Sequence, residues 1–86
     1  MSKMEDRKLR LQKLPKDYTF EEARTLLISL GFLEMTKGRT SGSRIKFYRP
    51  VDGKMINLHR PHPEKEMKSY AVKQLREFLL EIGELS

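Results

Sequence analysis

The sequence predicts a small α+β domain in which two helices pack on one face of a three-stranded antiparallel sheet. Three observations lead to this fold class. Apolar residues recur at helical spacing in two segments, near 20–30 and 69–82. Between them, residues 44–49 and 54–59 alternate apolar and polar side chains, as strands with one buried face do. A length of 86 residues is enough for one domain with a modest core.

The N-terminal part of the chain divides at about residue 17. Residues 1–17 are predicted to be a basic tail, because the short apolar stripe of Leu9, Leu11 and Leu14 is ended by Pro15. Residues 18–86 are predicted to form the folded domain. Its first helix begins near Thr19, where Thr19 and Glu22 have the spacing of a capping box. The apolar stripe that follows consists of Phe20, Ala23, Leu26, Leu27 and Leu30, before Gly31.

Three strands and a second helix follow in order. A short strand is expected over residues 32–35, then a loop rich in Gly, Ser and Thr, then a strand over residues 44–49. Asp52-Gly53 favours a two-residue hairpin turn, with the return strand over residues 54–59. The prolines at 61 and 63 end that strand, since proline cannot donate to a sheet ladder. The last helix is expected over residues 69–82, with the apolar stripe Val72, Leu75, Phe78, Leu79 and Ile82.

Strand alternation separates a core face from an open face. Successive side chains of a strand point to opposite faces, so the apolar positions of residues 44–49 and 54–59 share the core face. A two-residue turn at Asp52-Gly53 would set Tyr48 opposite Asn57 and Lys46 opposite His59. A shift of the strand register by one residue would bury Arg44 and Lys46, so the assignment of residues to the two faces is strongly favoured. The open face is then predicted to carry Arg44, Lys46, Tyr48, Met55, Asn57 and His59.

The positive charge is concentrated in the middle of the chain. The net charge is +6, and residues 36–60 alone carry seven lysines and arginines against one aspartate, Asp52. Segregated charge of this kind indicates a polyanionic partner, and an aromatic ring among the cations can stack on a nucleobase. We therefore predict an RNA contact on the hairpin. A merely solubilising surface is the alternative.

Other classes of site find less support in the sequence. There is no cysteine, so disulfides and thiolate metal sites are excluded. His59 and His62 lie on a proline-interrupted segment without a third obvious ligand, so no metal site is predicted. No glycine-rich phosphate loop occurs. No apolar run approaches the ~20 residues of a membrane span, and Met1–Arg10 lacks the apolar segment of a secretory signal, so a cytoplasmic location is expected.

Three segments resemble a known family. They are Leu30-Gly31-Phe32 at the end of a helix, Ser41–Phe47 (SGSRIKF), and Leu58–Lys68 (LHRPHPEKEMK). Over residues 14–85 the chain resembles HicA, the toxin of HicA/HicB toxin–antitoxin pairs. The resemblance implies a fold like a double-stranded-RNA-binding domain and an mRNA interferase that a HicB antitoxin silences. It also implies that no cofactor is needed.

The resemblance and the open face together give the candidate site residues. The family's usual catalytic histidine follows Gly-Ser, and here that position holds Arg44. His62 matches the histidine of the family's second segment, while His59 shares the predicted face with Arg44. His59 and His62 are therefore the catalytic candidates. The RNA-binding candidates are Lys37, Arg39, Ser43, Arg44, Lys46, Tyr48, Asn57 and Arg60.

Two non-catalytic functions stay open at the level of sequence. Because a guanidinium stays protonated, Arg44 is a poor base but a good phosphate ligand. The chain can therefore bind RNA without cutting it. It can also act as a protein-interaction module whose basic face binds an acidic antitoxin.

Overall fold

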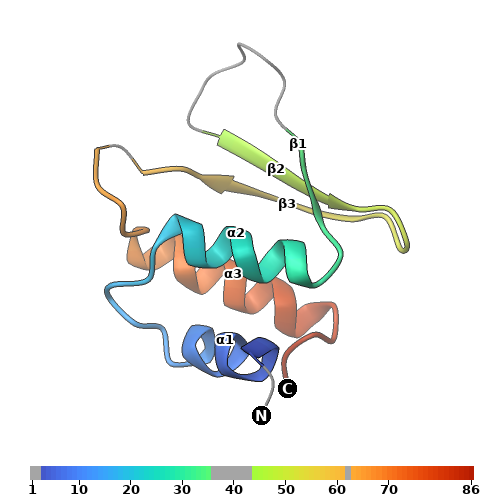
Figure 1. The fold of residues 1–86 in the computed structure, drawn as a ribbon, viewed down its shortest axis with the longest axis horizontal. Helices are drawn as coiled ribbons and strands as arrows, with labels where there is room; N and C mark the ends of the chain where they lie inside the picture. The colour runs from blue at the N-terminus through green and yellow to red at the C-terminus, as the bar shows by residue number, and fades with distance from the viewer. Residues whose placement is uncertain (1–2, 36–43, 62) are drawn as a thin grey trace.

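The structure confirms the α+β class. The computed structural model describes residues 3–35, 44–61 and 63–86. Three strands form one antiparallel sheet in the order β1-β2-β3, with the helices on one side of it (Figure 1). None of the helices in these ranges is long and apolar enough to cross a membrane. The elements are α1 (Lys3–Gln12), α2 (Phe20–Ser29), β1 (Leu33–Met35), β2 (Arg44–Arg49), β3 (Lys54–His59) and α3 (Ser69–Glu81).

Helix α2 begins with the predicted capping box. The Glu22 backbone N–H donates to the Thr19 hydroxyl over 3.1 Å, and the Thr19 N–H donates to the Glu22 carboxylate over 3.0 Å. These bonds satisfy backbone donors that the first turn of a helix leaves without partners. The helix ends at Ser29, two residues before Gly31, whose φ of 99° is left-handed and therefore suits glycine. Local sequence thus fixes both ends of α2.

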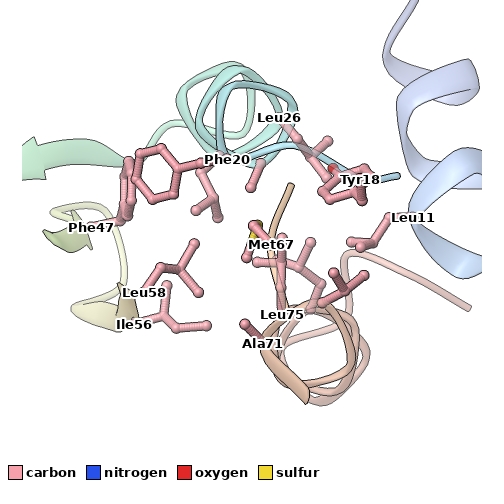
Figure 2. Close-up of a cluster of buried hydrophobic side chains, with 14 of the residues drawn as sticks. Leu11, Tyr18, Phe20, Leu26, Phe47, Ile56, Leu58, Met67, Ala71 and Leu75 are labelled. Carbon is pink, nitrogen blue, oxygen red and sulfur yellow. The ribbon is translucent and has the colours of Figure 1, made fainter. Parts of the chain in front are cut away.

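The core lies between the sheet and helices α2 and α3, and it extends between these two helices to Leu11 (Figure 2). Phe47, Ile56 and Leu58 point from the sheet toward the helices, and the Phe20 and Phe47 rings are 6.2 Å apart. The segment before α3 is held by backbone bonds to the chain entering α2, including Met67 N–H to the Tyr18 carbonyl at 2.8 Å. Burial of these apolar side chains is the main stabilising contribution to the fold. All the described helices lie on this side, so they leave the far side of the sheet uncovered.

In place of the predicted tail, Lys3–Gln12 form helix α1. This helix lies on the side of α2 and α3 away from the sheet (Figure 1). Leu11 is completely buried in the core, whereas Leu9 is half exposed. Arg10 bonds to the carboxylates of Asp17 and Glu22, which ties α1 to the start of α2. Met4 also packs against the core on one side of the helix, but the positions between Met4 and Leu11 on that side are Arg7 and Lys8, so the apolar pattern is too sparse to predict the helix without its tertiary contacts.

The predicted hairpin register is wrong by two residues. The turn is a four-residue loop, 50–53, closed by a bond from the Gly53 N–H to the Arg49 carbonyl at 2.8 Å. Arg49 therefore pairs with Lys54, Lys46 pairs with Asn57, and Arg44 pairs with His59. The longer loop prevailed over a two-residue Asp-Gly turn because Asp52 bonds to the Arg49 guanidinium. A shift of two residues keeps every side chain on its predicted face.

Candidate nucleic-acid interface

The candidate interface is the sheet face turned away from the helices, which we call the open face. In β2 and β3 the inward residues are buried except Lys54 beside the hairpin loop, whereas the residues between them are exposed or, for Tyr48, half-buried. The pairing of β1 with β2 adds two exposed apolar side chains, Leu33 and Met35, to the same face. The described residues of the open face are Leu33, Met35, Arg44, Lys46, Tyr48, Met55, Asn57 and His59.

These side chains form three rows across the strands. The first row, at the end of the sheet away from the hairpin loop, consists of Arg44 and His59. The second row consists of Met35, Lys46 and Asn57, and the third consists of Leu33, Tyr48 and Met55. Directly opposed residues of an antiparallel pair have Cβ atoms about 4.5–5.5 Å apart, so members of a row can contact one ligand group together. The face thus changes from cationic at one end to apolar at the other.

The corrected register sets Arg44 directly opposite His59. Both side chains are exposed to solvent. An imidazole can take up or release a proton near neutral pH, and a guanidinium can hold two oxygens of one phosphate. Lys46 lies on the same face two residues along β2, about 7 Å away along the strand. The row can therefore bind a phosphodiester and transfer a proton to or from it.

No carboxylate belongs to the open face within the described strands. The single acidic residue of β1, Glu34, points to the helix side, where it bonds to Arg24. Cations on such a face keep their attraction for anions, because within the described part of the sheet no acidic side chain lies on the face beside them. The face is therefore better suited to binding a polyanionic ligand than to forming surface ion pairs that only stabilise the fold.

Two arginines of the basic middle segment do not lie on the open face. Arg49 is buried on the helix side, where it bonds to Asp52, to Glu84 at 2.8 Å and to the Leu30 carbonyl. Its guanidinium lowers the pKa of the Asp52 carboxyl chiefly through their hydrogen bonds. Arg60 was predicted to bind RNA, but its guanidinium lies 5.3 Å from the centre of the Phe20 ring, on the helix side. The charge count alone could not separate these residues from Arg44 and Lys46.

Four predicted site residues cannot be placed. Lys37, Arg39, Ser43 and the catalytic candidate His62 lie outside the described residues. Their predicted roles stay predictions.

A groove of about 740 Å³ adjoins the open face between β3 and α3. Gln74 donates a hydrogen bond from its side chain to the Asn57 carbonyl at the edge of β3. The groove is lined by two acidic side chains of α3, Glu77 and Glu81. Their charge makes the groove a poor place for phosphates, so an RNA strand is better accommodated on the open face itself.

Comparison with known families identifies the chain. Residues 20–83 match the family described as HicA toxin of bacterial toxin-antitoxin. The chain belongs to the HicA toxin family. The resemblance noted in the sequence is thereby confirmed, and the chain is by family the toxin of a toxin–antitoxin system. No curated protein and no solved structure matches it.

The first row of the open face combines a cation with an imidazole. Arg44 follows Gly42-Ser43 in the sequence, and His59 faces it across the hairpin. The chain thus still offers one imidazole on the open face, from the opposite strand. Sequence reasoning missed the contribution of β1. The alternation of Leu33, Glu34 and Met35 was a signal for two outward apolar residues, but the strand that pairs with them, β2, is distant in the chain.

Proposed function

We propose that this toxin is a metal-independent endoribonuclease of the mRNA interferase type, acting in the cytoplasm and held inactive by a HicB-like antitoxin. The observation that carries the proposal is the opposition of Arg44 and His59 on an exposed face without carboxylates. The antitoxin partner is supported by family membership.

RNA brings its own nucleophile to the proposed reaction. The 2′-oxygen forms a bond to phosphorus while the bond from phosphorus to the 5′-oxygen breaks, leaving a 2′,3′-cyclic phosphate and a 5′-hydroxyl. One proton must leave the 2′-hydroxyl and one must reach the departing 5′-oxygen. His59 serves one of these transfers, and His62 is the candidate for the other. A positioned acid or base contributes about 10²–10⁴-fold to such a step.

The cations of the open face have a separate role in this proposal. Arg44 stays protonated, so it does not act as the base. It binds the phosphate oxygens and stabilises the additional negative charge that develops on them. Lys46 contributes a second positive charge in the next row. Asn57, directly opposite Lys46, adds a hydrogen-bonding amide.

A second candidate function is RNA binding without cleavage. The observation that favours it is Arg44 itself, since the family's histidine is replaced by a residue that cannot exchange a proton near neutral pH. A chain of this kind would retard RNA with a steep salt dependence and leave it intact. A pure antitoxin-binding module would neither retard RNA nor cut it.

The test uses purified toxin and two RNAs of the same sequence. One is natural RNA, and the other carries 2′-deoxyribose on the 5′ side of the cleaved bond. We expect wild type to cut the first only, and His59→Ala to lower the rate by about 100-fold or more. Lys54→Ala is a matched control, because Lys54 is exposed on β3 but belongs to the opposite face.

Growth of bacteria gives the second readout. Expression of the toxin alone is expected to arrest growth and degrade transcripts, and co-expression of a HicB-like protein is expected to prevent both. Intact RNA in vitro together with unimpaired growth, at good expression, would refute the ribonuclease. Retarded but uncut RNA would support the second candidate instead.

A further inference from the structure

The third row of the open face is unusually apolar for a solvent-facing strand surface. Leu33 is 52 % exposed and Met55 is 49 % exposed, and Tyr48 lies between them in direct register with both. Outward positions of a sheet with one solvated face are normally polar. The outward positions Arg44, Lys46, Asn57 and His59 follow that rule. Met35 beside Lys46 departs from it singly, whereas the third row departs from it at all three positions.

We propose that this row is a nucleobase platform and that the toxin therefore selects unpaired RNA. The inference rests on the proposed function of the open face and adds the class of substrate. The described open face offers cations at one end and a flat ring between two apolar side chains at the other. A single RNA strand has the complementary chemistry, because it joins negative phosphates to the apolar faces of its bases.

Base pairing removes what the platform would recognise. In a duplex the base faces are stacked on one another, and A-form RNA displays mainly phosphates, 2′-hydroxyls and base edges. Only an unpaired base can lay its face on the Tyr48 ring and contact Leu33 and Met55 beside it. The platform thus distinguishes single strands and loops from duplex, although the overall fold is of the double-stranded-RNA-binding type.

The distance between the rows sets where that base lies on the substrate. Four residues of strand separate Arg44 from Tyr48, which corresponds to about 13 Å. A stacked strand advances about 3.4 Å per nucleotide and an extended strand more, so the gap spans about two to four nucleotides. The recognised base is therefore about two to four nucleotides from the phosphate held by Arg44.

A protein partner fits the row less well. Stable protein interfaces bury about 800 Å² on each side, and three side chains supply only a fraction of that area. Within the described strands the row also continues into the cations of β2 rather than into a rim of mixed charge. These observations favour RNA, and a protein contact becomes an outcome of the test.

The test measures binding of an RNA that cannot be cut. A short 2′-fluoro oligonucleotide is used unpaired and, in parallel, annealed to its complement. We expect tighter binding of the unpaired strand, a loss on the order of tenfold in Tyr48→Ala for that strand only, and near wild-type affinity in Tyr48→Phe. Leu33→Ala is expected to weaken the same binding several-fold. Val51→Ala is the matched control, because Val51 is 85 % exposed but lies in the hairpin loop.

Several results would overturn the platform. Equal affinity for unpaired and duplex RNA would do so, as would a Tyr48→Ala variant that weakens both equally or neither. Unchanged RNA affinity with lost co-purification of the antitoxin would assign the row to a protein contact. Thermal unfolding of each variant controls for misfolding, and Tyr48→Phe and Leu33→Ala keep the test decisive if Tyr48→Ala does not fold.

The platform and the ribonuclease can fail separately. Binding as expected, without any cutting of natural RNA, refutes the ribonuclease and supports the platform. Equal cutting of unpaired and duplex RNA refutes the platform and supports the ribonuclease. Where natural RNA is cut, abasic substitutions should lower the rate most at about two to four nucleotides from the cleaved bond.

Discussion

Replacing Arg49 by alanine should destabilise the toxin far more than replacing any cation of the open face. Arg49 is the buried charged residue among those described, and its guanidinium connects the hairpin loop, the end of α2 and the residues after α3. It donates to Asp52 over 2.7 and 3.0 Å, to Glu84 over 2.8 Å and to the Leu30 carbonyl over 3.2 Å. It also lies 4.8 Å from the centre of the Phe32 ring.

The loss of stability expected for Arg49→Ala depends on which partners of Arg49 water can reach after the substitution. The Glu84 carboxylate is partly exposed and can be rehydrated when Arg49 is removed, so its ion pair is not lost at full value. The lasting losses are the bond to the Leu30 carbonyl, the contact with Phe32 and part of the carboxylate bonds. We expect Arg49→Ala to lower the free energy of unfolding by about 2–4 kcal/mol. A domain of this length has on the order of 5–10 kcal/mol in total.

Urea unfolding measures this change. With a slope of about 1 kcal/mol per molar urea, the midpoint should fall by about 2 M or more. Arg44→Ala is the matched control, because Arg44 lies on the same strand with its side chain on the opposite, solvated face. That variant should stay within about 0.5 kcal/mol of wild type. Equal loss in both variants, or no loss in Arg49→Ala, would refute the reasoning.

Three further predictions concern the open face and the hairpin loop. Arg44→His places a second imidazole directly opposite His59, and should add an ionisation near neutral pH to the pH–rate profile; Lys46→His controls for an added imidazole elsewhere on β2. Lys46→Ala should weaken RNA binding uniformly across sequences and reduce the slope of log affinity against log salt by about one, whereas an unchanged slope would contradict a phosphate contact. The pKa of Asp52 is lowered in the folded state by its hydrogen bonds from Arg49, so its stabilisation is present above the unfolded pKa and is lost as the pH falls through the folded one. Urea unfolding between neutral and acidic pH should therefore show a smaller acid loss in Asp52→Asn than in wild type.

Much of the fold follows from local sequence. The Thr19 capping box, Gly31 and the alternation in residues 44–49 and 54–59 specify α2, β2 and β3 where the structure has them. Each of these signals acts within a few residues and does not depend on a distant partner. Helix α1 is the counterexample, since it is held by Leu11 and Arg10 contacts with segments that follow it.

The sequence predicted which face of the sheet carries the candidate site, but not which residues lie opposite one another on it. Alternation assigned Arg44 and His59 to one side of the sheet, and the structure agrees. The pairing of Arg44 with His59 was not predictable, because it depends on a loop length that the Arg49–Asp52 ion pair selects. The apolar row was also not predictable, since Leu33 meets Tyr48 only through the pairing of β1 with β2, a strand that is distant in the chain.

The sequence by itself determined that this chain is a basic α+β domain of the HicA toxin family and which strand positions face solvent. Side-chain period, capping and turn residues are local properties, and they survive an error of two residues in register. Only the tertiary structure decided what each cation does. Arg44 and Arg49 are the ends of the same strand and count equally in the net charge. Packing against α2 and the residues after α3 buries Arg49, which connects these segments through its hydrogen bonds. Arg44 lies on the other face of the sheet, opposite His59, where a ligand can reach it.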